Sequence, residues 1–124
     1  MNNVKSKSVE IELGAQLFKI EFDFNVLCEI QERYGSLDTL DERLQDVREI
    51  RWLLTVLLNE AIDKENDEGA EKKHVDESWV GRTVNFKNIG ELAAKIAEAF
   101  GASMPDAGVE AGDEGEDDPN SKTE

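Results

Sequence analysis

The chain has 124 residues, of which 29 are acidic and 14 basic, so its formal net charge is −15. This charge argues against direct binding to nucleic-acid phosphates or anionic lipid, and favours a basic partner or mimicry of nucleic acid. The length allows one small domain. No run reaches the roughly 18 apolar residues of a membrane-spanning helix, and the N-terminus lacks a signal-peptide core. The single cysteine fits a reducing compartment. We therefore expect a cytosolic protein.

Two short stretches near the N-terminus predict a β-hairpin. Apolar residues at positions 9, 11 and 13 alternate with glutamates, and those at 18, 20 and 22 alternate with Lys19 and Glu21. This alternation is typical of half-buried strands. The sequence Gly14-Ala15-Gln16 between them can turn the chain. Because two strands alone are marginally stable, their apolar face is expected to pack on helices.

A first helix is predicted from Asp23, a suitable N-cap, to Gly35, which can end it with a positive φ. Its broad apolar side includes Phe24 and Cys28, and we expect this cysteine to be buried and inert. Ser36 is expected to cap a short second helix with three leucines on one face: Leu37, Leu40 and Leu44.

The stretch from Asp46 to Lys64 predicts the main core helix. Asp46 is its expected N-cap, and Glu49 three residues later completes a capping-box pattern. Seven apolar residues with helical spacing form one stripe: Ile50, Leu53, Leu54, Leu57, Leu58, Ala61 and Ile62. Trp52 and Val56 fall on the opposite face, with Asn59 between them around the helix. A helix that is apolar on two sides either lies centrally in a bundle or offers a second surface to a partner, and Trp52 fits both interpretations. These three residues are the candidate partner contacts.

The second half predicts shorter elements. Residues 64–75 carry almost no apolar side chain and are expected to form a mobile loop. Helical turns follow between Asp76 and Val84, with Trp79 interpreted as a core residue. A last helix is expected from Asn88, with Glu91 completing a capping box and Gly101 closing it. One face carries the apolar residues Ile89, Leu92, Ala93, Ile96, Ala97 and Phe100.

Residues 103–124 differ sharply in composition, with eight acidic residues against one lysine. Such a segment cannot offset the entropy of ordering, so we expect a disordered acidic tail. The predicted fold is therefore one α+β domain over residues 1–102, a β-hairpin packed on about four helices, followed by that tail.

The sequence carries no pattern typical of an enzyme, a cofactor site or a metal site. His74, the only histidine, lies in the polar loop without a recognisable nucleophile nearby. The acidic run DEGEDD lacks the spacing of a calcium-binding loop. We therefore expect a non-enzymatic protein without a cofactor.

Two passages resemble a known family. LFKIEFDFNVLCEIQERYGSLDTL leads from an alternating strand into a helix ending in Tyr-Gly-Ser-Leu, and the leucine-rich REIRWLLTVLLNEA follows. Residues 17–61 are in this respect similar to the tail assembly chaperones of long-tailed bacteriophages and prophages. The resemblance implies a protein that binds the tape measure protein, keeps it soluble and helps recruit tail tube protein. It also implies action in the host bacterial cytoplasm and absence from the mature virion.

An alternative function is that of an acidic DNA-mimic inhibitor of a nucleic-acid-binding protein. That function needs rows of carboxylates on the folded domain, whereas almost half of the net charge lies in the predicted tail. The oligomeric state stays open at this point.

Overall fold

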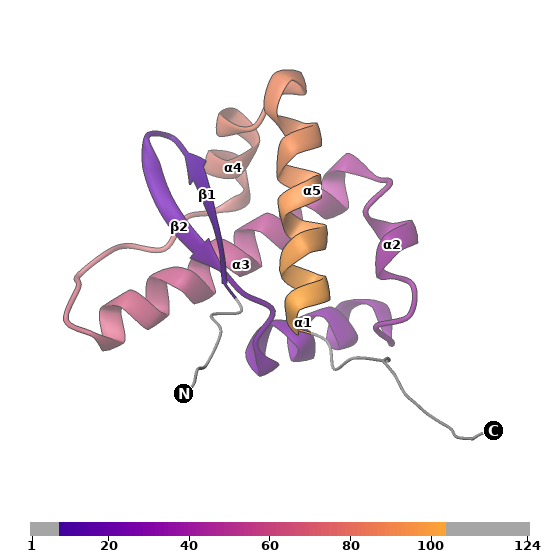
Figure 1. Ribbon diagram of the computed structural model, residues 1–124, viewed down its shortest axis with the longest axis horizontal. Helices are drawn as coiled ribbons and strands as arrows, with labels where there is room; N and C mark the ends of the chain where they lie inside the picture. Colours follow the sequence, from indigo (N-terminus) through magenta and orange to yellow (C-terminus); the bar gives the residue numbers. More distant parts are fainter. Residues whose placement is uncertain (1–7, 104–124) are drawn as a thin grey trace.

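The computed structural model describes residues 8–103, which begin with an antiparallel hairpin of β1 (Val9–Leu13) and β2 (Gln16–Ile20) (Figure 1). Gly14 and Ala15 both have positive φ, 59° and 63°, as a two-residue hairpin turn requires. One face of the hairpin is buried, as the alternation predicts, by the side chains of Val9, Ile11, Leu13, Phe18 and Ile20.

The hairpin turn packs against Trp79. A Cβ built on Gly14 would lie 2.9 Å from the Trp79 ring, so only glycine lets the turn approach this closely. The Trp79 ring also meets Phe18 edge to face, with ring centroids 6.4 Å apart. The interpretation of Trp79 as a packing residue agrees with these contacts.

Helix α1 (Phe24–Tyr34) begins and ends where the sequence predicts. Asp23 accepts a hydrogen bond from the Val26 N–H, and Gly35 closes the helix with φ 85°. Its buried residues, however, are Val26 and Ile30. Cys28 is exposed, so the expectation of a buried cysteine is wrong. At about 100° per residue, Cys28 lies roughly 200° around the helix from Val26. Phe24 points outward for the same reason, with 78% of its surface exposed.

Helix α2 (Leu40–Arg43) is a single turn with Thr39 at its N-cap position and no side-chain capping bond. The expected cap by Ser36 is wrong, because Ser36 accepts a hydrogen bond from the Asp38 N–H ahead of the helix. Helix α3 (Val47–Asp67) then runs through the middle of the molecule (Figure 1). All seven predicted stripe residues are buried. Asp46 caps the helix through the Arg48 N–H, but Glu49 does not complete a capping box, because its carboxylate binds α1 instead.

The predicted mobile loop is shorter than expected, because residues 64–67 belong to α3. The segment after α3 is also held at two points. Asn66 makes two hydrogen bonds with the backbone of Lys72, and Asn59 makes two with the backbone of Val75. Side chains on α3 therefore position this segment, in which Val75 is partly buried against the core.

Helices α4 (Glu77–Thr83) and α5 (Phe86–Ser103) complete the described chain. Asn85 caps the start of α5, three residues before Asn88, the expected cap. Its side chain accepts hydrogen bonds from the N–H groups of Lys87 and Asn88, and Asn88 accepts one from the Asn85 N–H in return. Gly101 lies inside the helix, which runs on to Ser103.

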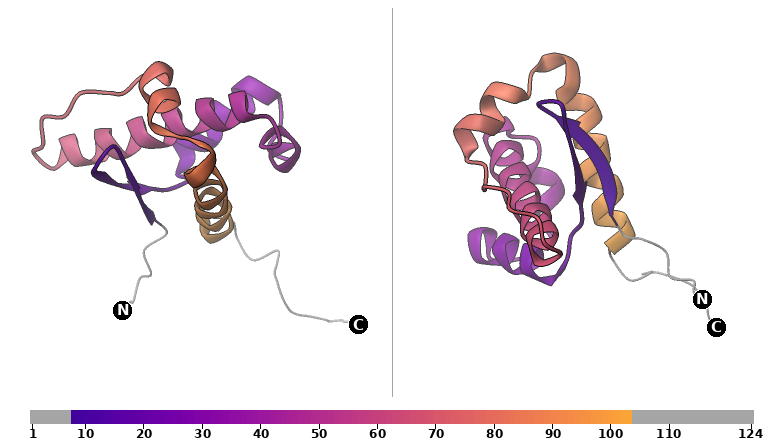
Figure 2. Two further views of the ribbon diagram at one scale, coloured as in Figure 1. Left: turned by 90° about the horizontal axis from the view of Figure 1, so that it is seen from above. Right: turned by 90° about the vertical axis from the view of Figure 1, so that its left-hand side faces the viewer.

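The elements form one packed α+β unit. Strand β2 packs on α3 and β1 on α5, while α1 and α4 cover other sides of α3 (Figure 2). The predicted fold class, a hairpin packed on helices, is confirmed, with five helices between residues 8 and 103. The expected tail lies outside the described residues from position 104 onward. Within the described range, no helix is long and apolar enough to cross a bilayer.

Candidate protein interface

The Trp52 side of α3, expected to face a partner, is covered by α1. The Trp52 ring meets the Tyr34 ring edge to face, with centroids 5.7 Å apart. The Arg33 guanidinium carbon lies 4.4 Å from the centroid of the Trp52 ring, within the range of a cation–π contact. Trp52 is therefore half-buried in its own chain, and α1 covers part of this face.

Glu49 holds this α1–α3 seam, which we define as Arg33, Tyr34, Glu49 and Trp52. Its carboxylate accepts hydrogen bonds from the Tyr34 hydroxyl at 2.5 Å and from the Arg33 Nε at 2.9 Å. Burial, followed by the bond to Glu49, raises the pKa of Tyr34 to about 12. The contacts with Arg33 and Tyr34 lower the pKa of Glu49. The seam is therefore closed by paired groups.

Asn59, the third predicted partner residue, is engaged within the chain. Its side chain donates to the Val75 carbonyl at 2.9 Å and accepts from the Val75 N–H at 2.8 Å. Val56 is half-buried against the core. His74 lies on the surface close by, 2.7 Å from an Asp63 carboxylate oxygen. Partner binding by Trp52, Val56 and Asn59 stays a prediction, and the structure shows that all three support the fold.

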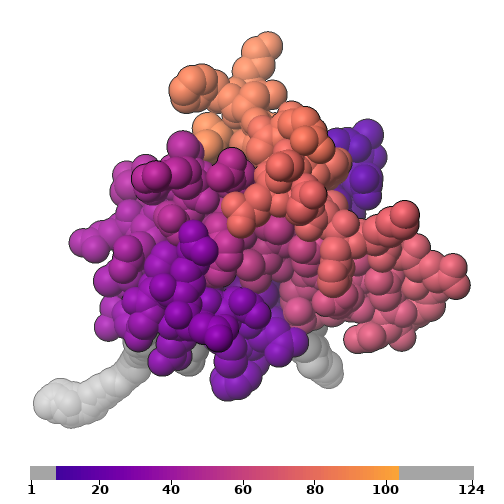
Figure 3. Space-filling view, turned by 180° about the vertical axis from the view of Figure 1, so that it is seen from behind, coloured from indigo at the N-terminus to yellow at the C-terminus, as the bar shows by residue number. Residues whose placement is uncertain are grey.

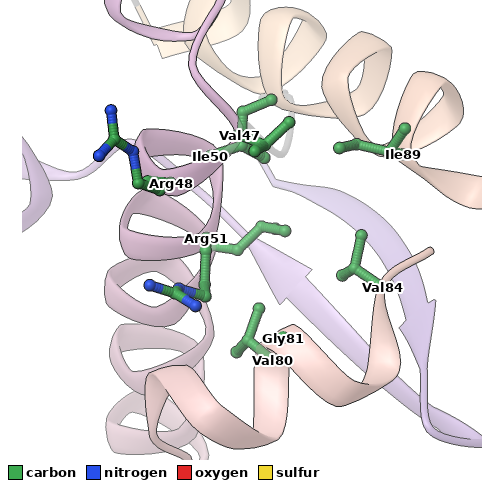
Figure 4. A pocket seen from close by; sticks show the side chains of 9 residues that line it. Val47, Arg48, Ile50, Arg51, Val80, Gly81, Val84 and Ile89 are labelled. Carbon is green, nitrogen blue, oxygen red and sulfur yellow. The ribbon is translucent and has the colours of Figure 1, made fainter. Parts of the chain in front are cut away.

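A second site, missed by the sequence reasoning, lies on another side of α3. We call it the corner pocket, because α3 meets α4 and the start of α5 there (Figure 4). It encloses about 200 Å³. Its lining is apolar apart from two arginines: Val47, Arg48, Ile50, Arg51, Leu54, Val80, Gly81, Val84 and Ile89.

The floor of the corner pocket is rigidly built, whereas its rim is open. Leu54 and Val80 are fully buried and Ile50 nearly so, because they belong to the main core. On the rim, 60% of the surface of Val47 is exposed. Phe86, between the lining residues Val84 and Ile89 in sequence, is 97% exposed. Val47 therefore adds exposed apolar surface to the rim of the pocket, and Phe86 is a second exposed apolar side chain at the start of α5.

Local capping explains why Phe86 is outside. With Asn85 as the cap, Phe86 becomes the first helical residue of α5, and the buried face of the helix starts later, at Leu92. The space-filling view shows the α4–α5 corner, in orange, projecting from the rest of the back surface (Figure 3). An aromatic side chain at this corner is therefore accessible to a partner.

Arg51 and Gly81 shape one wall of the pocket. A Cβ on Gly81 would lie 3.4 Å from Cδ of Arg51, so the arginine stem passes over the glycine. The Nε of Arg51 lies 3.4 Å from a Glu77 carboxylate oxygen, which is a long contact between half-exposed side chains. Arg48 turns its guanidinium outward (Figure 4), where it pairs with Asp46 at 2.9 Å. No carboxylate side chain lines the pocket.

A separate charged cluster joins the hairpin, α1 and α3. Lys64 lies 2.9 Å from Asp23 and 3.2 Å from Glu21. Burial acts to raise the pKa of Asp23, but hydrogen bonds with Glu60, Lys64 and the Val26 N–H together lower it. A hydrogen bond with Asp23, then burial, raises the pKa of Glu60. These side chains have partners inside the chain, so the cluster serves the fold.

Other hollows on the described part of the chain have mixed polar and apolar linings, such as the one beside Gln16 that the residues Lys72, Lys73 and His74 help to line. Among residues 8–103 no three side chains of the types His, Cys, Asp and Glu come together in a way that could hold a metal ion. No family model, curated protein or solved structure matches the chain. The corner pocket is accordingly the feature on which a function can be argued.

Proposed function

We propose that this protein is a tail assembly chaperone of a long-tailed bacteriophage or prophage. In this proposal it binds the tape measure protein in the host cytoplasm, keeps it soluble, and helps to recruit tail tube protein before leaving the finished tail. The resemblance of residues 17–61 to that family supports the proposal. The single structural observation in its favour is the corner pocket with its exposed apolar rim.

A chaperone for a hydrophobic protein needs apolar contact surface and must itself stay soluble. The net charge of −15 favours solubility. The pocket offers apolar surface at one corner, its lining residue Val47 is exposed, and Phe86 is exposed at the start of α5. The DNA-mimic alternative has less support, because carboxylates along α3 are paired with arginines: Glu49 with Arg33, and Asp46 with Arg48.

Co-expression tests the proposal. Overlapping fragments of the tape measure protein from the same genome are produced with and without this chain, and their soluble fraction and co-purification are measured. We expect at least one fragment to become soluble only with the chaperone. Phe86→Ser should reduce this rescue, whereas Phe24→Ser should retain it. Phe24 is a matched control, since it is also an exposed helical phenylalanine but lies on α1.

The opposite result is equally clear. If no fragment is rescued or captured, the tail assembly function is wrong. If a host DNA-binding protein co-purifies instead, and DNA displaces that protein, the DNA-mimic function replaces the tail assembly function.

A further inference from the structure

We propose that the corner pocket receives one large apolar side chain from an amphipathic segment of the tape measure protein, and that a carboxylate beside this side chain pairs with Arg51. This inference rests on the proposed function and adds the chemistry of the partner segment. It follows from three properties of the pocket: its size, its charge and the place of Gly81.

The size of the pocket suits a single side chain. Apolar cavities of about 150 Å³ accommodate a benzene ring, so about 200 Å³ holds one aromatic or branched aliphatic group. The floor is preformed, because Leu54 and Val80 have no exposed surface. Val47 lines the pocket and is 60% exposed, so it adds apolar surface at the opening, as contact with the apolar face of a helix would require.

The charge of the pocket favours an acidic residue next to the inserted side chain of the partner. Acidic residues outnumber basic ones two to one in this chain, yet both charged residues that line the pocket are arginines. Arg48 is held by its bidentate contact with Asp46. Among residues 8–103, the carboxylate paired with the Arg51 guanidinium is that of Glu77, at 3.4 Å. A guanidinium carries five N–H donors, so Arg51 can take a second carboxylate. An acidic residue on the partner is therefore complementary to this rim.

Gly81 keeps the opening clear. It is exposed, lies within α4, and lines the pocket without a side chain. Its backbone is not in the positive-φ region, so a larger residue fits the helix there. The nearest obstacle to a Cβ is the flexible Arg51 stem at 3.4 Å. Leucine at this position would partly fill the pocket while leaving the core residues in place.

The test measures the binding of a fluorescently labelled tape measure fragment, one rescued in the co-expression experiment, to the full chain by anisotropy. Gly81→Leu should weaken binding at least about tenfold, the scale of a lost central anchor. The control Gly101→Leu, at the far end of α5 where a Cβ meets no atom within 4 Å, should bind normally (Figure 1). Thermal melts confirm that both variants are folded.

The charge contact is tested by reversal and rescue. Arg51→Glu should weaken binding at low salt and much less at 1 M salt, where the Debye length is about 3 Å. Replacing the responsible acidic residue of the fragment with lysine should restore binding to Arg51→Glu. Lys73→Glu, an exposed charge reversal outside the pocket, is the matched control.

The outcomes separate the two proposals. If no fragment binds the natural chain, the tail assembly function itself fails. If a fragment binds and Gly81→Leu binds it equally well, the corner pocket is not the site, while the function stands. If Gly81→Leu weakens binding and no lysine substitution rescues Arg51→Glu, the carboxylate pairing is wrong.

Discussion

The α1–α3 seam and the corner pocket both lie along the first half of α3, and they differ in how they are filled. In the seam, one indole ring occupies the space between the helices, and Arg33, Tyr34 and Glu49 satisfy one another around it. At the corner, the residues that face α3 are two valines, a glycine and an isoleucine, which leave about 200 Å³ open. Whether apolar surface of α3 is open to a partner therefore depends on the side chains of the other helices that lie opposite it.

The largest expected effect concerns the core that both regions share. Leu57 is fully buried in the middle of α3. Leu57→Ala should lower the free energy of unfolding by roughly 2–5 kcal/mol, because it removes transfer energy and leaves a cavity. Urea denaturation measures this change. A loss below about 0.5 kcal/mol, the size typical of surface positions, would contradict the burial of this stripe.

The next effect tests the closed side of the comparison. Trp52→Ala should cost about 1–3 kcal/mol, because a half-buried ring loses its contacts with Tyr34 and Arg33. Trp52→Phe, which keeps an aromatic edge toward Tyr34, should cost less. Near-UV circular dichroism during denaturation follows both variants. The remaining folded protein should capture the partner as well as the natural chain does. If Trp52→Ala lost partner capture while staying folded, the binding site would lie on the α1–α3 seam.

The two sides could be predicted from the sequence to different degrees. Periodicity was sufficient for the hairpin and the α3 stripe, and local side-chain chemistry for the caps at Asp23 and Asp46. These features depend on residues within a few positions of one another. The cap at Asn85 was missed because Asn88 offers the same chemistry three residues later, and only the packing of α5 separates the two.

Hydrophobic periodicity could not predict contacts between residues that are distant in the sequence. The sequence left open whether Trp52 packs within its own chain, because its neighbour Tyr34 lies 18 positions away on another helix. The corner pocket joins Val47 to Ile89 across three helices, so no local pattern could indicate it. One signal was available in advance: Phe86 follows an asparagine that can cap a helix, and a first-turn position is often outside the core.

A matched pair of glycine substitutions sharpens the contrast between filled and open space. Gly81→Ala should raise the free energy of unfolding by about 0.5–1 kcal/mol, since alanine is favoured within helices and the site has room. Gly14→Ala should lower it, because φ is +59° and the new Cβ would lie 2.9 Å from the Trp79 ring. Thermal melts compare the two. Destabilisation by Gly81→Ala would mean that the corner is already closely packed.

The smallest effect concerns the pH dependence of the charged cluster. Because the pKa of Glu60 is raised in the folded protein, its stabilising contribution is present at low pH and is lost as pH rises through that pKa. The pKa of Asp23 is lowered in the folded protein, so its stabilising contribution is present above its ordinary pKa and is lost as pH falls through the lowered pKa. Glu60→Gln should therefore gain a few tenths of a kcal/mol at pH 7 and little at pH 4, as a surface change does. Urea denaturation at the two pH values compares the variant with the natural chain, and a larger gain at pH 4 would reverse the assigned sign.

The most direct measurement of which side meets the partner is a map of backbone amide chemical shifts during titration with a tape measure fragment. We expect the largest changes around the corner pocket, at Val47, Gly81 and Phe86, and small changes at Tyr34 and Trp52. The opposite pattern, with changes concentrated on the α1–α3 seam and none at the corner, would show that the open pocket is not the contact surface.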